Sequence, residues 1–186
     1  MQLIARVTHR DVGHMLLTLA EARKRPQCED FLEGFPWLSM PWYKVEKLTV
    51  TEFEALYLCW DGMAWGKQEA LPRRLKQGTQ EFMDLVTAHR ERPHFGHMQA
   101  ILEQRDVYRS GYTDDKPFLI VVARDTAGPF MMLEGNHRAV AAQWWAIESG
   151  QQAHLPRYAW MGLSPDMGVY PSYQRVLTAD RRSLAS

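Results

Sequence analysis

The sequence predicts a single α+β domain in which helices flank a small mixed β-sheet. Its length of 186 residues suits one domain, and its 46% hydrophobic and 24% charged residues are typical of a chain that buries a core. Short apolar runs typical of strands are interspersed with segments whose apolar residues recur at helical spacing. We divide the domain into an N-terminal helical and loop extension (residues 1–42), a core (43–165) and a C-terminal tail (166–186).

Five segments carry the pattern of β-strands. Residues 118–123 are the strongest of them, because every residue in this run is apolar. A turn at residues 125–128 joins this run to residues 130–133, which predicts a β-hairpin. The other expected strands are residues 1–8, 43–48 and 157–163.

Five further segments show the periodicity of helices. Thr49 or Thr51 is placed to cap the helix expected from there to Trp60, and Gly150 ends the last helix. We interpret residues 61–78, which are rich in glycine and basic side chains, as either a solvated loop or a mobile lid. The last residues, through Arg181 and Arg182 to Ser186, are expected to be a frayed end. The expected helices are residues 11–24, 49–60, 79–90, 96–105 and 139–149.

Charge and cysteine content exclude several classes of protein. The chain has 22 basic and 22 acidic residues, whereas proteins that bind nucleic acid by bulk electrostatics are usually basic. Its two cysteines, Cys28 and Cys59, cannot build a disulfide framework or a cysteine-rich zinc site. The N-terminus lacks a signal-peptide pattern, and no uncharged apolar stretch reaches about 18 residues. We therefore expect a soluble, cytoplasmic protein that does not enter a membrane.

The stretch Glu134-Gly135-Asn136-His137-Arg138 lies between an expected strand and an expected helix. A helix N-terminus presents unpaired N–H groups and partial positive charge, and a preceding glycine allows a ligand to approach the backbone. His137 and Arg138 add side-chain donors, and a bound anion such as phosphate would offset their unfavourable position in the helix dipole. The sequence thus predicts an anion site here. The alternative is an ordinary strand-to-helix turn with an exposed arginine.

The same stretch carries a family resemblance. With the apolar runs before it, from Pro117 to Val122 and from Phe130 to Leu133, and the helix after it, it resembles the ParB/sulfiredoxin superfamily. In that family a strand, a turn, a second strand, a D-G-x-H-R motif and a helix form the nucleotide phosphate site. Residues 43–52 resemble the family's opening strand and short helix, so the likeness covers less than a third of the chain.

The resemblance implies a nucleotide-dependent enzyme, either a small-molecule kinase or a nucleotide hydrolase, with Mg²⁺ and ATP or another nucleotide as cofactors. It places Mg²⁺ at Glu134, where the family usually has Asp, and catalysis at Glu52, as base, and His137. The second substrate would be an unidentified small-molecule acceptor. The residues that the resemblance assigns to phosphate binding are Gly135, Asn136, His137 and Arg138.

This chain also departs from its relatives. Sulfiredoxins have a cysteine where this chain has Asn136, so their thiol chemistry is not implied. ParB proteins carry a helical DNA-binding region after the nucleotide domain, and only about 36 residues follow Gly150 here. A partition role is therefore not favoured.

Two other function classes stay open. One is a non-catalytic nucleotide- or DNA-binding ParB-like regulatory module, and the other is a bacterial or phage accessory protein that keeps the fold for protein contacts. Catalysis requires Glu52 and Glu134 to point at the phosphate loop, whereas Glu52 can instead be an ordinary acidic residue at a helix N-terminus. DNA binding requires a continuous basic face built from Arg73, Arg74, Lys76 and Arg90.

Overall fold

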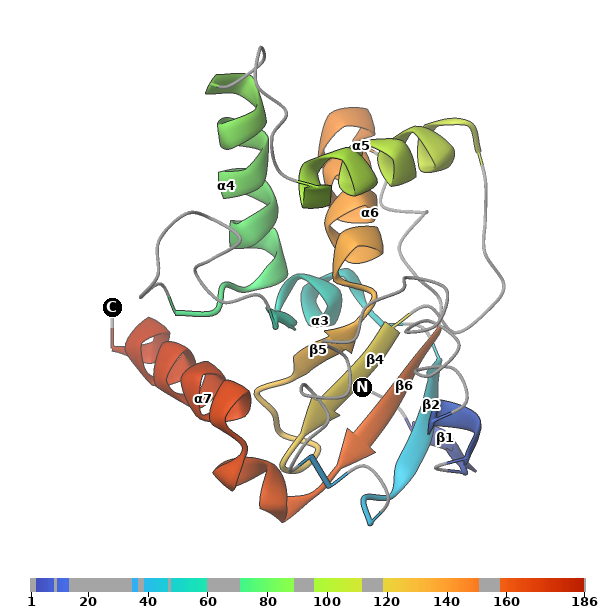
Figure 1. The fold of residues 1–186 in the computed structure, drawn as a ribbon, viewed down its shortest axis with the longest axis vertical. Coiled ribbons are helices and arrows are strands. Elements are labelled where there is room, and N and C mark those ends of the chain that lie inside the picture. Colours follow the sequence, from blue (N-terminus) through green and yellow to red (C-terminus); the bar gives the residue numbers. More distant parts are fainter. Residues whose placement is uncertain are drawn as a thin grey trace.

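A mixed β-sheet organises the fold in the computed structural model (Figure 1). The structure describes residues 3–8, 10–13, 35–36, 39–46, 48–59, 71–88, 96–111, 119–150 and 158–185. Within these ranges six strands form one sheet in the order β1-β2-β6-β4-β5-β3. The strands are β1 (Leu3–Val7), β2 (Trp42–Glu46), β3 (Tyr57–Leu58), β4 (Leu119–Ala123), β5 (Met131–Glu134) and β6 (Tyr158–Leu163).

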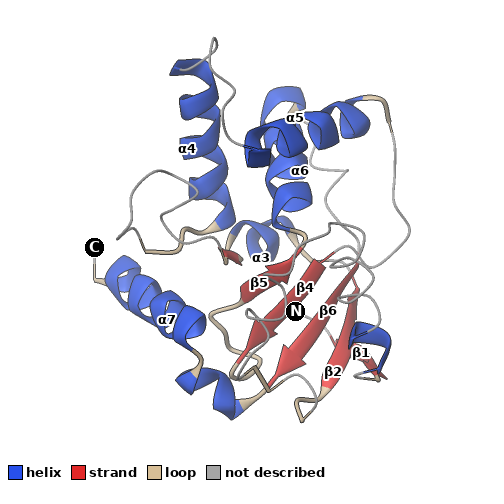
Figure 2. Ribbon diagram, viewed as in Figure 1, coloured by secondary structure: helices blue, strands red, loops and turns tan. Residues whose placement is uncertain are grey.

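Helices surround this sheet (Figure 2). Residues 10–13 are helical, and the further α-helices are α3 (Val50–Glu54), α4 (Leu75–Ala88), α5 (Gly96–Arg109), α6 (Asn136–Ser149) and α7 (Pro171–Leu184). A 3₁₀ helix, η3, covers Pro165–Val169. Antiparallel pairs join β1 to β2, β2 to β6 and β4 to β5, and parallel pairs join β4 to β6 and β3 to β5. The α+β class, the mixed sheet and the β4–β5 hairpin are thereby confirmed.

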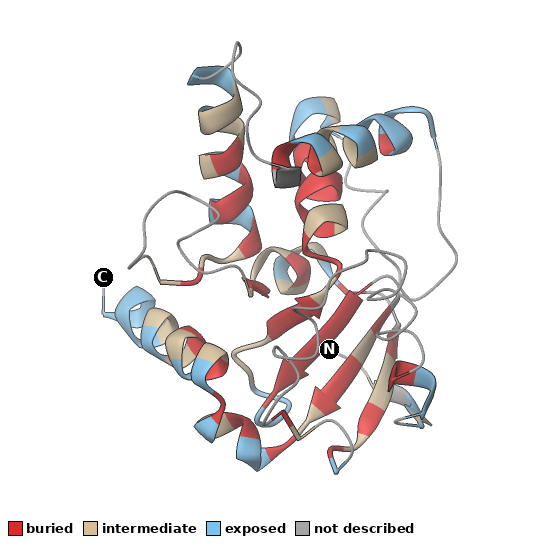
Figure 3. Cartoon of the chain, in the orientation of Figure 1, coloured by how far each residue is buried: buried red, intermediate tan, exposed pale blue. Residues whose placement is uncertain are grey.

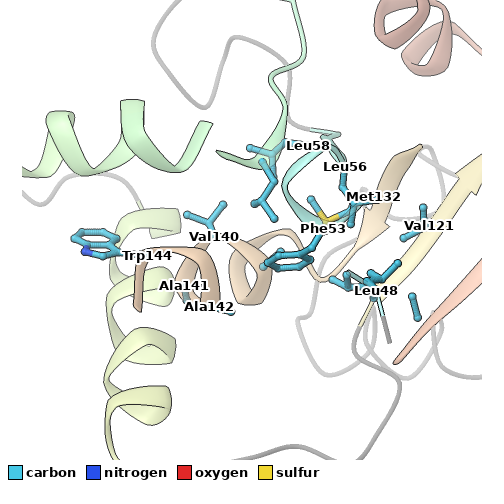
Figure 4. Close-up of a cluster of buried hydrophobic side chains, with 14 of the residues drawn as sticks. Leu48, Phe53, Leu56, Leu58, Val121, Met132, Val140, Ala141, Ala142 and Trp144 are labelled. Atoms are coloured by element: carbon cyan, nitrogen blue, oxygen red, sulfur yellow. The ribbon is translucent and has the colours of Figure 1, made fainter. Parts of the chain in front are cut away.

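The two faces of the sheet pack against different elements, because successive side chains of a strand point to opposite sides. Leu119 and Val121 of β4 join the core that α3, α4, α5 and α6 complete, part of which Figure 4 shows. Ile120 and Val122 join a second core with residues of η3 and α7. As Figure 3 shows, β4 is buried along its whole length. Continuous burial is typical of a central strand covered on both faces.

The predicted helix over residues 49–60 is wrong in its second half. Helix α3 ends at Glu54, and Tyr57–Leu58 form β3 instead. Leu56, Tyr57 and Leu58 are all buried, and the Tyr57 N–H donates to the Phe130 carbonyl over 2.8 Å. In an extended segment consecutive side chains point to opposite sides, so Leu56 and Leu58 pack in the core of α3 to α6 and Tyr57 packs in the second core.

Other helix boundaries also differ from the predictions. Helix α4 begins at Leu75 rather than at residue 79, α5 runs on to Arg109, and α6 begins at Asn136 rather than at residue 139. Before α4, Arg74 forms an isolated β-bridge with Tyr57, and the Leu75 N–H donates to the Leu56 carbonyl over 2.7 Å. The predicted helix 11–24 is described only over residues 11–13, which are helical, and residues 61–70 of the predicted loop or lid lie outside the described ranges.

The predicted frayed end is also wrong, because residues 171–184 form α7. Pro171 occupies the first turn, where proline is tolerated, and Tyr173 and Val176 are buried against the sheet. The Tyr173 hydroxyl donates to the Pro129 carbonyl over 2.6 Å and accepts from the Arg124 N–H over 3.2 Å. Packing on the second face of the sheet therefore orders this segment. None of the helices that the structure describes is long and apolar enough to cross a membrane.

Candidate functional site

The predicted anion loop lies where two parallel strands end and a helix begins. Strand β5 ends at Glu134, Gly135 turns the chain, and α6 begins at Asn136. Strand β3 runs parallel to β5, with Leu58 paired to Met132, so the residue directly after β3 lies beside this turn. Ligands of open α/β sheets commonly bind at such carboxyl ends of strands. We call residues 135–138 the 135–138 loop.

Gly135 makes this turn possible. Its φ of 93° lies in the left-handed region, where a residue with a Cβ is strained. The first intrahelical bond of α6 runs from the Ala139 N–H to the Gly135 carbonyl over 2.8 Å. The N–H groups of Asn136, His137 and Arg138 therefore precede the helical hydrogen-bond ladder. The first turn of α6 contains no acidic residue, so its positive dipole end has no carboxylate of that turn beside it.

Arg138 and Glu134 lie on either side of the turn. Arg138 Nη2 is 3.9 Å from Glu134 Oε1, at the outer limit of an ion pair, and the side chains are 23% and 14% exposed. A pair this long and partly open to solvent is weak. A phosphate would be a stronger anionic partner for the guanidinium than this carboxylate at 3.9 Å.

Asn136 directs its side chain away from solvent. Its Oδ1 accepts from the Cys59 backbone N–H over 3.2 Å, and its Nδ2 donates to Cys59 Sγ over 3.2 Å. Sequence reasoning treats Cys59 only as a free thiol and does not find this contact, because the partners are 77 residues apart. A phosphate contact by Asn136, as predicted, would accordingly come from its backbone N–H.

Glu52 belongs to a capping box at the start of α3. Its Oε2 accepts from the Thr49 N–H over 2.9 Å, and its own N–H donates to the Thr49 hydroxyl over 3.2 Å. Burial raises the pKa of Glu52, but hydrogen bonds, including those from the Thr49 N–H and hydroxyl, outweigh it, so the pKa lies below the ordinary value. Its neighbour Glu54 is the α3 carboxylate that bonds to α6, at Gln143 Nε2 over 3.0 Å.

The basic residues predicted as a lid or a DNA-binding face are held in ion pairs. Arg73 Nε lies 3.0 Å from a Glu81 oxygen, and Lys76 Nζ lies 3.1 Å from Glu54. Arg74 Nη2 lies 3.0 Å from Asp180, and its Nε donates to the Tyr57 hydroxyl. These contacts join elements of the fold, which argues against both predicted roles. Arg90 lies outside the described residues.

Metal ligands are sparse around the loop. Over the ranges that the structure describes, no three His, Cys, Asp or Glu side chains are grouped to hold a metal ion. Glu134 beside the loop offers one carboxylate. Mg²⁺ is commonly bound by one or two carboxylates together with substrate phosphates and water, so Glu134 fits an ion that arrives with a nucleotide. His137, half-buried, occupies the second position of α6.

Comparisons of this chain with family models, with curated proteins and with solved structures find no match. The resemblance to the ParB/sulfiredoxin superfamily consequently stays a prediction from the sequence.

Proposed function

We propose that this chain binds a nucleotide through its phosphate groups at the 135–138 loop. The observation that carries the proposal is the left-handed turn at Gly135, after which α6 opens with Asn136, His137 and Arg138 at the carboxyl end of β5. Three N–H groups at a helix N-terminus and a guanidinium on the same first turn make a suitable phosphate site. An arginine presents its donors as a planar fork that matches phosphate oxygens.

The family resemblance supports a nucleotide-dependent enzyme, a small-molecule kinase or a nucleotide hydrolase. In that case Glu134 would hold a Mg²⁺ that neutralises phosphate charge, and His137 and Arg138 would orient the phosphates. Glu52 would be the base for the acceptor hydroxyl or water.

The capping box favours the second candidate, a non-catalytic nucleotide-binding module. The Glu52 carboxylate bonds to Thr49, and its lowered pKa makes it a weaker base than an ordinary glutamate. The ion pairs of Arg73, Arg74 and Lys76 support neither a lid nor a DNA-binding face in that region.

A thermal-shift panel tests nucleotide binding directly. ATP, ADP, CTP, GTP and pyrophosphate would each be added with and without Mg²⁺. A ligand that binds only the folded chain raises the free energy of unfolding by about 2.7 kcal/mol at one hundred times its Kd. We expect at least one nucleotide to raise Tm. No shift with any of these compounds at millimolar concentration would reject the proposal.

Turnover with the best nucleotide then separates the two candidates. For an enzyme with Glu52 as base, Glu52→Gln should keep nucleotide binding and lose most of the turnover, because Gln cannot accept the proton. Full activity in this variant would reject the base assignment. The absence of phosphate release or transfer by a wild-type chain that binds the nucleotide would favour the binding module.

A further inference from the structure

A small polar network surrounds the turn at Gly135. Directly after β3, Cys59 donates its backbone N–H to Asn136 Oδ1 over 3.2 Å, and its Sγ accepts from Asn136 Nδ2 over 3.2 Å. The same Sγ lies 3.9 Å from the Leu133 carbonyl in β5, at the outer limit of a weak S–H donor. Cys59 thus contacts the chain two residues before Gly135 and one residue after it.

The Asn136 amide is committed to this network. Asn136 is only 6% exposed and is the only asparagine in the sequence. Because a backbone N–H can only donate, the bond from Cys59 assigns Oδ1 as the acceptor and leaves Nδ2 to donate to sulfur. Asparagine has a low helix propensity, so helix formation does not explain why it stands at the first position of α6, whereas its hydrogen bonds to Cys59 do.

The network joins the end of one strand to the start of a helix. The first N–H groups of α6 can bind an anion only if the helix start keeps its position relative to the β5 end, and the Gly135 turn between them has no side chain to brace it. Cys59, directly after the neighbouring parallel strand β3, fixes the helix start through its hydrogen bonds to Asn136.

From these contacts we infer that Asn136 is a positioning residue for the 135–138 loop. Its side chain holds the loop in place through hydrogen bonds to Cys59, and its backbone N–H is left to face the bound phosphate. This inference rests on the proposed phosphate binding. It assigns Asn136 a role that differs from direct side-chain contact with phosphate, because the amide already has two partners on Cys59.

The test compares pyrophosphate affinity, by titration calorimetry, in wild type, Asn136→Ala and Gln143→Ala. Gln143 is the matched control, because it is a buried amide of the same helix, 3% exposed, whose partner is Glu54 rather than the loop. We expect Asn136→Ala to raise the Kd about fivefold or more, the effect of losing one hydrogen bond. Gln143→Ala should lower Tm about as much as Asn136→Ala does, but it should leave the Kd for pyrophosphate unchanged.

Two further measurements separate positioning from general destabilisation. Hydrogen exchange at the Cys59 amide should become faster in Asn136→Ala and stay unchanged in Gln143→Ala, since only the first variant removes its acceptor. Cys59→Ala keeps the backbone N–H, so it should weaken pyrophosphate binding less than Asn136→Ala does. Asn136→Ser, which keeps a short acceptor, replaces Asn136→Ala if that variant does not fold, and its Kd should also rise.

The outcomes distinguish this inference from the proposed function. If wild type binds pyrophosphate and Asn136→Ala or Asn136→Ser binds it equally well, the positioning role is overturned and the phosphate site stands. The positioning role is also overturned if Gln143→Ala loses as much affinity as Asn136→Ala. If wild type binds neither pyrophosphate nor any nucleotide, the phosphate site itself fails, and the role of Asn136 fails with it.

Discussion

Glu52 shows how a single residue can be assigned two different roles from sequence. The resemblance makes it a base, and in the structure it is the third residue of α3, which forms a capping box with Thr49. An acid at this position suits both roles, because a carboxylate near a helix N-terminus stabilises the helix whether or not it also reacts. The stability of the helix can therefore be measured separately from any activity.

The lowered pKa of Glu52 predicts a pH-dependent contribution to folding. A carboxyl with a folded-state pKa below its ordinary value of 4.5 stabilises the fold above that value, and this stabilisation is lost as pH falls through the lowered pKa. Gln also completes a capping box but carries no charge, so at pH 7 Glu52→Gln should be less stable by about 0.3–1 kcal/mol. In urea denaturation this difference should vanish on acidification below pH 4.5.

Glu103→Gln, which removes an exposed carboxylate from the middle of α5, is the control for a general charge effect. A difference between wild type and Glu52→Gln that stays constant from neutral to acidic pH would show that the charged cap contributes nothing.

Arg138 is the residue on which the phosphate site depends most directly. Arg138→Ala removes a side chain whose ion pair with Glu134 is long, at 3.9 Å, and the loss of that pair should change stability little. Affinity for the best nucleotide should fall by about 1–3 kcal/mol, the range for a charge-assisted hydrogen bond. Calorimetric titration measures this change. Arg73→Ala, which breaks the pair with Glu81, is the control, and equal affinities of wild type and Arg138→Ala would remove Arg138 from the site.

At the scale of elements, the close packing of β3 against α4 depends on a residue from each of them. Gly78 of α4 faces the buried Leu58 of β3, and a Cβ placed at Gly78 would lie 2.5 Å from Leu58 Cδ1. Leu58 therefore leaves no room for a Cβ at this position of α4 unless the leucine side chain shifts. This lack of room also explains why a glycine is retained inside a helix, where it is otherwise unfavourable.

Gly78→Ala should accordingly destabilise the chain although alanine favours helices. Overpacking of a buried site costs about 1–3 kcal/mol, more than the helix propensity gained. Thermal or urea unfolding measures the balance. Thr87→Ala on the exposed side of α4 is the control, and it should be neutral or slightly stabilising. A Gly78→Ala variant as stable as wild type would mean that Leu58 moves away without cost.

Helix α7 is connected to the hairpin turn by Tyr173. Burial raises the pKa of Tyr173 to about 12, from an ordinary value of 10.0. The folded chain thus keeps the phenol neutral at a pH where the unfolded chain ionises it. Stability from this group is complete below pH 10 and is lost as pH rises toward 12.

Tyr173→Phe tests this connection. At neutral pH the variant should lose about 1–2 kcal/mol, because the Pro129 carbonyl and the Arg124 N–H lose their partner. Urea unfolding between pH 9 and 11 should then show a smaller decline for Tyr173→Phe than for wild type. Equal declines would show that other groups govern the alkaline transition.

At the scale of the whole molecule, both faces of the sheet carry apolar side chains that other elements must cover. Helices α3 to α6 complete one core, and η3 with α7 contribute to the other, over Ile120, Val122, Met131 and Leu133. Ending the chain after Tyr170 would uncover these apolar residues. Exposed patches of this kind promote aggregation, so the truncated chain should be insoluble or unfolded.

A chain that ends after Leu184 keeps all of α7 and should match wild type in Tm. Expression, size-exclusion chromatography and circular dichroism distinguish these outcomes. A folded, monomeric chain that ends at Tyr170 would contradict the view that α7 is part of the core.

Local patterns of the sequence by themselves determined most strands, the β4–β5 hairpin and the glycine turn before α6, and they limited the cap of α3 to Thr49 or Thr51, of which the structure has Thr49. These features depend on residues within a few positions of one another, so their signals lie in short stretches of sequence. Helix α7 has such a signal as well, with Pro171 in its first turn and Tyr173, Val176 and Leu177 at helical spacing, and our prediction of a frayed end overlooked it.

Only the tertiary structure decided the conformation of β3 and the partners around the candidate site. Tyr57 bonds to Asp180 across 123 residues, Arg74 to Asp180 across 106, and Cys59 to Asn136 across 77. At such separations a residue's own neighbours in sequence carry no information about its partner. The physical reason is that burial between two layers, not local propensity, selects the conformation of a segment as short as β3 and directs polar side chains to whatever partner the fold brings near.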